Sequence, residues 1–246
     1  MEQYELKFWL SESGSLQLEH ALIQLGERCV FDRDRPVAFA YTTYLDTDDG
    51  HFFHADGSVT SRLRVREYAA ARRLDETPIW TGLCYLEYKH RWGALRQKHR
   101  WNMSQIAARG IVAALRNGDD PLRSLARLDR VPAWSRELRR ATLRPFLCTW
   151  YRCTTFRLGA ARVTIDRDIS FSAPFPDHRP PWAVAPFDQR SSCIVEIKCC
   201  DLRALALLSD ALADAGAMTL RASKYQLAVQ AAQRRGLAVP SRRASG

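Results

Sequence analysis

The sequence predicts an α+β domain in which one face of a β-sheet is cationic. The first observation is the segment from Ser61 to Tyr68, where Arg62, Arg64 and Arg66 share one face because successive strand residues point to opposite sides. Four more segments alternate charged and apolar residues in the same way, at residues 5–8, 86–91, 162–166 and 195–198. The second observation is that apolar residues at helical spacing lie between the strand-like segments. Strands with interspersed helices favour a single α+β domain.

The first half of the chain is predicted to form five strands and two helices. Val, Thr and Tyr are enriched in the strand-like segments, and turns containing Asp and Gly separate them. The predicted strands span residues 3–10, 37–45, 61–68, 81–91 and 95–101, and the helices span residues 16–25 and 104–116. We expect Gly26 to follow the first helix and Ser104 to be the N-cap of the second.

The second half is predicted to contain three more strands, which gives about eight in total. They span residues 146–156, 161–171 and 194–199, and helices are expected at residues 121–144, 201–215 and 223–236. Pro145 is expected to end the first of these helices, and Asp201 and Ser223 to cap the others. Five prolines predict a loop at residues 174–190. No linker is visible, so we expect one domain over residues 1–236 and a flexible tail over residues 237–246.

The composition indicates a basic protein of a reducing compartment. Lys and Arg number 37 against 27 Asp and Glu, a net charge of +10, which favours polyanionic partners such as nucleotides, polyphosphate, nucleic acid or an acidic membrane. Seven cysteines, an odd number without a CxxC pair, do not indicate a disulfide framework. No signal-peptide pattern and no long apolar run are visible, so we expect a cytoplasmic protein without a transmembrane segment.

The cationic faces allow two arrangements. If the sheet closes on itself, the charged faces line a lumen that holds an anion, and the apolar faces pack against the helices. If the sheet is open, the charged face is solvated. Alternation of side chains does not distinguish these two arrangements.

Eight short motifs follow one another along residues 4–232. They are Glu5-x-Lys7, Tyr44-Leu45-Asp46-Thr47, Arg64-x-Arg66-x-Tyr68, Glu87-x-Lys89-His90-Arg91, Lys98-x-Arg100, Arg162-Val163-Thr164-Ile165-Asp166, Glu196-x-Lys198 and Ser223-Lys224-Tyr225. In this order they resemble the VTC domain, the polyphosphate-polymerase branch of the triphosphate tunnel metalloenzymes. The resemblance implies a CYTH-like closed antiparallel β-barrel flanked by helices. It also implies ATP or another triphosphate as substrate and a divalent cation, Mn or Mg, as cofactor.

The resemblance also implies the residues of the site. The expected catalytic residues are Arg64, Arg66, Lys89, Arg162 and Lys198, and the expected phosphate-binding residues are Lys7, Arg64, Arg66, Lys89, Lys98, Arg100, Tyr151, Arg152, Arg162, Lys198, Ser223 and Lys224. These residue types suit phosphate, because guanidinium groups bind its oxygens in pairs and a helix N-terminus adds backbone donors. Phosphoryl transfer depends on neutralising the moving charge more than on covalent help.

Acidic residues interrupt the cationic faces. Glu196 is the expected metal ligand, since hard cations accept carboxylate and phosphate oxygens together. The alternative is that Glu196 forms an ion pair with Lys198 or Arg64. Glu5 and Glu87 are expected to balance charge.

The strand at residues 146–156 departs from the pattern of the family. Cys153 stands where the family usually has an inward-facing arginine. Either Arg152 takes over that role through a β-bulge, or one phosphate contact is lost. On the next strand, Asp166 is expected to orient Arg162 or Arg66.

Four functions remain open from the sequence. The first is a metal-dependent polyphosphate polymerase that transfers the γ-phosphate of ATP to a polyphosphate chain in a basic tunnel. The second is an inorganic or nucleoside triphosphatase in the same tunnel, and the third is a non-catalytic module that binds polyphosphate or inositol phosphates. The fourth, a nucleic-acid binder, rests on net charge alone, and no nucleic-acid-binding motif accompanies it, so we expect no specific nucleic-acid partner.

Overall fold

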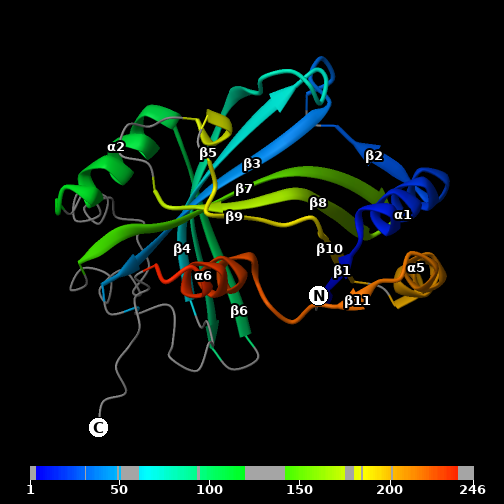
Figure 1. Ribbon diagram of the computed structural model, residues 1–246. Helices are drawn as coiled ribbons and strands as arrows, with labels where there is room; N and C mark the ends of the chain where they lie inside the picture. The colour runs from blue at the N-terminus through cyan, green and yellow to red at the C-terminus, as the bar shows by residue number, and fades with distance from the viewer. Residues whose placement is uncertain are drawn as a thin grey trace, which may run out of the picture.

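A strongly curved antiparallel sheet forms the centre of the protein in a computed structural model (Figure 1). The structure describes residues 4–30, 32–48, 50, 61–92, 95–119, 142–174, 180–183, 185–200 and 202–237. Within these ranges the sheet has 11 strands, and four α-helices lie against it. The expected architecture, an antiparallel sheet with flanking helices, is therefore confirmed.

Each long strand pairs in antiparallel fashion with its neighbours. The strands are β1 (Tyr4–Leu10), β2 (Glu27–Cys29), β3 (Val37–Thr47), β4 (Ser61–Ala71), β5 (Ile79–Trp92), β6 (Leu95–Met103), β7 (Leu143–Leu158), β8 (Ala161–Ser172), β9 (Asp188–Gln189), β10 (Cys193–Cys199) and β11 (Met218–Thr219). Their order across the sheet is β11-β1-β10-β8-β7-β3-β4-β5-β6, with β2 beside β7 and β9 beside β8. The short strands β2, β9 and β11 were not predicted, because two or three residues are too few to show an alternation of apolar and polar side chains.

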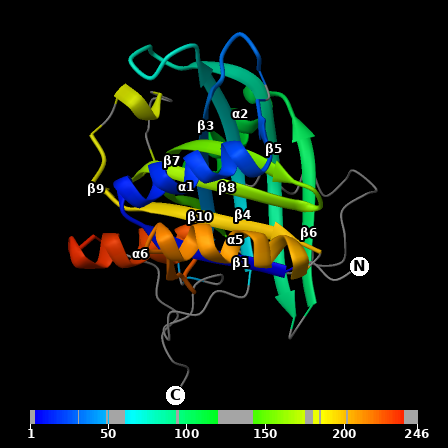
Figure 2. The same ribbon diagram turned by 90° about the vertical axis from the view of Figure 1, so that its right-hand side faces the viewer.

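The sheet folds over so that one half faces the other. Figure 2 shows β7, β8, β10 and β1 running across β3, β4, β5 and β6. The long strand β7 joins the two halves, since it pairs with β3 from Leu143 to Cys153 and with β8 from Cys148 to Leu158. In the described part of the chain, no ladder joins β6 to β1 or β11 at the ends of the strand order. Closure of the barrel by backbone hydrogen bonds, which was expected, is thus not observed.

Four helices cover the sheet. They are α1 (Glu12–Leu25), α2 (Gln105–Arg116), α5 (Leu202–Asp214) and α6 (Lys224–Arg234), and a 3₁₀-helix spans Pro181–Ala183. Ser11, Ser104 and Ser223 are N-caps whose side chains accept a hydrogen bond from a backbone N–H of the first turn. The predicted caps Ser104 and Ser223 are therefore confirmed, whereas α1 begins four residues earlier than expected because Ser11 caps it. None of the described helices is long and apolar enough to cross a membrane.

Apolar faces of the strands are buried beneath three of these helices. Leu18 and Leu22 of α1 pack with α5 against β8 and β10 (Figure 1). The apolar face of α2 covers Leu63 and Val65, which alternate with the arginines of β4. Helix α6 is different, because its Tyr225 packs against the opposite face of the sheet. The charged faces thus point inward, and α6 covers part of that inner side.

Two expectations about the middle of the chain fail or go untested. Pro145 does not end a helix, because β7 already begins at Leu143 and continues through it. Pro145 pairs with Leu45 where the register between β3 and β7 shifts, a position that tolerates the missing backbone donor of proline. The helix expected at residues 121–144 lies outside the described residues up to 141, as do Asp201 and the tail from residue 238.

Candidate functional site

The inner faces of the sheet enclose a cavity of about 330 Å³, here called the cationic pocket. Its wall contains residues of β1, β3, β4, β5, β6, β7, β8 and β10, together with the start of α6. Its basic side chains are Lys7, Arg62, Arg64, Arg66, Lys89, Lys98, Arg100, Arg162, Lys198 and Lys224, and its acidic ones are Glu5, Asp166 and Glu196. Ten basic side chains against three acidic ones around one cavity favour binding of a polyanion.

The cationic pocket gathers most of the residues that the sequence predicted. Eleven of the twelve expected phosphate-binding residues line it, including all five expected catalytic residues, and so does Glu196. The exception is Arg152. Strand alternation explains this outcome, because a row of inward residues stays inward along the whole strand.

Glu87 forms the most buried charge cluster beside the pocket. Its side chain has no exposed surface, and its carboxylate accepts from Arg64 Nε and Arg100 Nε at 2.7 Å each and from Lys98 Nζ at 2.9 Å. Burial alone would raise the pKa of Glu87, but the neighbouring cations, Arg64 first, hold it far below its ordinary value. Glu87 therefore stays ionised and fixes three cations in place, as its expected charge-balancing role requires.

Glu5 and Glu196 form a second cluster on β1 and β10. Lys7 Nζ lies 2.9 Å from Glu5 Oε1, and Lys198 Nζ lies 2.9 Å from Glu196 Oε1 and 3.4 Å from Glu5 Oε2. Burial and Glu196 raise the pKa of Glu5, but Lys7 and Lys198 outweigh them and lower it to about 2. The pKa of Glu196 is also well below its ordinary value, because Lys224 and Lys198 outweigh its burial. The alternative ion pair between Glu196 and Lys198 is thus present.

The donor set of this second cluster fits a divalent cation only in part. Among the described residues, no three His, Cys, Asp or Glu side chains come together as a complete metal cage. Glu5 and Glu196 do place two ionised carboxylates in the wall of the pocket. Magnesium and manganese are commonly held by one or two carboxylates plus substrate phosphates and water. The residues present therefore fit a cation that arrives with a phosphate substrate.

Asp166 has a different partner from the one expected. Lys224 Nζ lies 2.5 Å from its Oδ2, so Asp166 binds the first residue of α6 rather than Arg162 or Arg66. Burial lowers the pKa of Lys224, but Asp166 and Glu196 outweigh this effect and raise it. Lys224 consequently remains charged at the end of the pocket that α6 covers.

Four basic side chains of the pocket have no carboxylate partner. Within the described part of the chain, Arg62, Arg66, Lys89 and Arg162 make no ion pair shorter than 4 Å. The pKa of Lys89 falls to about 6, because of Arg64 first and then burial, Lys198 and Arg62. Arg62 lies opposite Lys89 in the β4–β5 ladder, and burial lowers its pKa as well. The predicted site did not include Arg62. Its shared strand face with Arg64 and Arg66 is the sequence signal that could have identified it.

A protein-family model described as the VTC domain matches residues 2–233. The chain belongs to the VTC domain family. No curated protein is similar enough to count as a relative.

Solved structures extend the comparison to the fold. A candidate adenylate cyclase from Bacillus halodurans superposes with a TM-score of 0.52 at 13% identity, over 91% of this chain and 96% of that chain. A candidate adenylate cyclase from Vibrio parahaemolyticus gives a TM-score of 0.46 at 14% identity, over 92% and 99%. PH1012 from Pyrococcus horikoshii gives 0.42 at 10% identity, over 87% and 90%. At identities this low, a match shows the fold alone. The first of these matches therefore shows that this VTC domain shares the CYTH-like fold.

Cys153 holds the inward position of β7 in this VTC domain, and Arg152 does not replace the family's arginine. Cys153 lines the cationic pocket, whereas Arg152 points to the other face, where its Nε donates to Asp168 Oδ2 at 2.8 Å. A bulge is present, but its extra residue is Asp168 of β8, with a φ of 54°, so the alternation of β7 is unchanged. One arginine contact to the pocket is thus absent.

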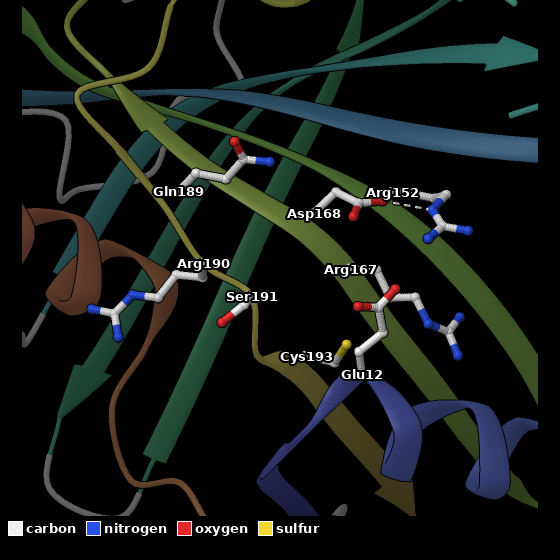
Figure 3. A pocket seen from close by; sticks show the side chains of 8 residues that line it. All are labelled: Glu12, Arg152, Arg167, Asp168, Gln189, Arg190, Ser191 and Cys193. Atoms are coloured by element: carbon white, nitrogen blue, oxygen red, sulfur yellow. Dashed lines mark hydrogen bonds and ion pairs between the residues drawn. The ribbon is translucent and has the colours of Figure 1, made fainter. Parts of the chain in front are cut away.

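Arg152 instead lines a separate cavity of about 290 Å³ near the start of α1 (Figure 3). The arginines around this cavity do not converge, since Figure 3 shows Arg190 pointing away from Arg152 and Arg167. Arg167 is also saturated, because it donates to Ser15 and pairs with Glu19 at 2.7 Å. This second cavity is therefore not a phosphate site comparable with the cationic pocket.

Proposed function

We propose that this protein is a metal-dependent polyphosphate polymerase that transfers the γ-phosphate of ATP to a polyphosphate chain in the cationic pocket. The observation that carries the proposal is a set of four basic side chains that face one cavity without a carboxylate partner among the described residues, namely Arg62, Arg66, Lys89 and Arg162. Buried like charges are unfavourable, and a bound polyanion compensates them. Membership of the VTC family supports a triphosphate or polyphosphate as that anion.

The reaction requires one bond to form and one to break. A terminal oxygen of the polyphosphate bonds to the γ-phosphorus of ATP, and the bond from that phosphorus to the β–γ bridging oxygen breaks. ADP leaves with the bridging oxygen and its electron pair. Negative charge moves onto this oxygen, so catalysis consists mainly of placing cations around the transferred group. Arg64 and Arg100 suit this task because Glu87 holds both guanidinium groups rigidly.

Glu196, with Glu5, would hold Mn or Mg together with the phosphates of the substrate. When bound, such a cation would neutralise part of the negative charge of the substrate phosphates. Lys7 forms an ion pair with Glu5, and Lys198 forms one with Glu196. These ion pairs hold the two carboxylates in position for that role.

Chain extension agrees better with this pocket than hydrolysis does. Water must lose a proton when it attacks phosphorus, whereas a polyphosphate oxygen is already anionic. The carboxylates that line the pocket are poor bases, since Glu5 and Glu196 have strongly lowered pKa values and Asp166 is paired with Lys224. Lys89 is neutral only while the pocket is empty, because a bound phosphate favours its ammonium form.

Incubation of the purified protein with ATP and Mn tests the proposal. The expected products are ADP and a ladder of polyphosphate chains, resolved on a gel, and Glu196→Gln should reduce their formation strongly. Arg152→Ala is the matched control, because it removes an arginine of the same sheet that faces away from the pocket. Free phosphate without chain growth would identify a triphosphatase, and tight polyphosphate binding without turnover would identify a binding module.

A further inference from the structure

A row of three polar side chains, here called the polar row, crosses the inner face of the sheet beside the cationic pocket. Thr42 pairs with Thr149 in the β3–β7 ladder and with Arg66 in the β3–β4 ladder. Paired residues of neighbouring strands project to the same side of a sheet, and Arg66 lines the pocket, so all three face inward. Thr42 and Thr149 are not part of the pocket lining. The polar row therefore extends from the wall of the pocket into the protein interior.

Core side chains of the inner face enclose the two threonines. Thr42 is 0% exposed and Thr149 is 1% exposed. The next inward residue of β3 is Tyr44, whose ring packs against Tyr225 of α6 with the ring centroids 4.7 Å apart. The next inward residue of β7 is Tyr151, which is also buried. Bulk water therefore does not reach the two hydroxyl groups.

Each residue of the polar row has a buried polar atom without a hydrogen-bond partner. These atoms are Thr42 Oγ1, Thr149 Oγ1 and Arg66 Nε, and none of the residues that the structure describes bonds to them. Most buried polar groups in proteins are hydrogen-bonded, and a buried group without a partner is destabilising. Three such atoms in one row indicate a shared partner outside the described side chains.

The polar row carries a positive charge that no described carboxylate balances. Arg66 makes no ion pair, its Nη2 donates to the Tyr151 hydroxyl, and its guanidinium lies 5.7 Å from the ring centroids of Tyr68 and Tyr151. Its Nε–H can only donate a hydrogen bond, and a threonine hydroxyl can donate as well. A negatively charged acceptor is complementary to all three groups, whereas a water molecule would leave the charge of Arg66 uncompensated.

We propose that the polar row binds one small monovalent anion, chloride, through Arg66, Thr42 and Thr149. A halide ion accepts hydrogen bonds from any direction, so it suits three donors that come from three different strands. A phosphate has four oxygens, and the core side chains around the row would leave several of them without a donor. The inference goes beyond the proposed function, because this anion is not a substrate and takes no part in phosphoryl transfer.

Bromide, which replaces chloride and scatters anomalously, locates the site in crystals of the wild-type protein. Crystals grown in sodium bromide should show an anomalous peak within hydrogen-bond distance of Thr42, Thr149 and Arg66. A peak confined to the cationic pocket, or no peak, would overturn the inference. This measurement does not depend on the folding of any variant.

Thermal unfolding tests the two hydroxyl groups. Exchanging sodium gluconate for sodium chloride at constant ionic strength should raise the melting temperature by about 2–4 °C, as expected for a ligand at roughly five times its dissociation constant. The double variant Thr42→Val with Thr149→Val keeps the side-chain shapes and should lose most of this shift. Thr43→Val is the matched control, because Thr43 is buried on the same strand but its Oγ1 lies 3.5 Å from Cys148 Sγ on the opposite face. An equal chloride response in the double variant and the wild type would refute the site.

Bound chloride should also weaken anion binding in the cationic pocket, since Arg66 belongs to both sites. Calorimetry should give a several-fold lower affinity for tripolyphosphate in chloride than in gluconate for the wild type, and a smaller difference for the double valine variant. Equal salt effects in the two proteins would contradict this coupling. The coupling rests on the proposed binding of a polyanion, whereas the bromide peak and the melting temperature do not. If tripolyphosphate fails to bind in either salt, the proposed function fails and the chloride site is still decided by those two measurements.

Discussion

Lys224 Nζ lies 2.5 Å from Asp166 Oδ2, so the first residue of α6 is attached to the inner face of β8. The next residue, Tyr225, donates its hydroxyl to Asp46 Oδ2 of β3 at 2.6 Å. These two contacts fix the start of α6 to both halves of the folded sheet. The end of the cationic pocket is therefore set by adjacent residues of one helix.

Asp166→Asn should destabilise the protein and strengthen anion binding. The substitution leaves Lys224 without its carboxylate, and breaking a buried ion pair costs about 3 kcal/mol of unfolding free energy. It also releases Lys224 for phosphate, so the affinity for tripolyphosphate should rise several-fold. Urea unfolding and calorimetry measure the two effects, and Asp75→Asn at an exposed ion pair is the control. Unchanged stability would contradict the role assigned to the pair.

Glu87→Gln should cost about 3–5 kcal/mol of unfolding free energy at neutral pH, because three cations lose their shared partner. The pKa of Glu87 is lowered in the folded protein, so its contribution is present above the unfolded value of 4.5 and is lost as pH falls below it. The difference between wild type and variant should therefore shrink in acid. Saturating tripolyphosphate should stabilise the variant more than the wild type, which differential scanning calorimetry can measure. A difference independent of pH would contradict this account.

Lys89→Met should stabilise the empty protein. The pKa of Lys89 is about 6 when folded against 10.5 as the ordinary value, so the unfolded chain binds the extra proton between these limits. The wild type is thus penalised increasingly as pH falls from 10.5 to about 6, and the penalty is constant below. The gain for Lys89→Met should be about 1–3 kcal/mol at pH 7 and vanish above about pH 10.5. Urea unfolding across this pH range measures it.

The lowered pKa of Lys89 predicts that the protein takes up a proton when an anion binds. Tripolyphosphate should draw close to one proton onto Lys89 at about pH 7.5, because it stabilises the ammonium form. Calorimetry in two buffers of different ionisation enthalpy counts this proton, and Lys89→Met should not take it up. Equal uptake by both proteins would assign the proton elsewhere.

Arg62→Ala should weaken tripolyphosphate binding about 10- to 100-fold, the effect expected when a charge-assisted hydrogen bond to an anion is lost. The unfolding free energy should rise or stay constant, because Arg62 has no carboxylate partner to leave behind among the described residues. Arg152→Ala, which removes an arginine outside the pocket, should change the affinity less than about twofold. Equal losses for Arg62 and Arg152 would show that overall charge, and not the pocket, binds the anion.

Much of the pocket follows from a property fixed by covalent geometry. Side chains of a strand alternate between two faces, so the shared face of Arg62, Arg64 and Arg66 is recognisable from the sequence alone. The caps Ser104 and Ser223 are recognisable for a related reason, since an N-cap depends on contacts within one turn. Local rules therefore predict which residues face inward and where helices begin.

Contacts between distant segments are not predictable in the same way. The partner of Asp166 depends on how α6 docks, which no alternating pattern encodes. A bulge could have turned Arg152 inward, but the bulge lies at Asp168 on the neighbouring strand. The prediction that Pro145 ends a helix is wrong, because Pro145 lies in a strand. The strand accommodates it through a shift in register against β3, which the sequence alone does not reveal. Whether the sheet closes likewise depends on its curvature and not on the sequence of one strand.

The strand order ends at β6 on one side and at β11 and β1 on the other, with no ladder between them in the described residues. In a fully hydrogen-bonded barrel, a long polymer could enter and leave only through the two open ends. Here the two edges can part without breaking any backbone hydrogen bond between them. Under the proposed polymerase activity, a growing chain of phosphates would have a lateral way out of the protein.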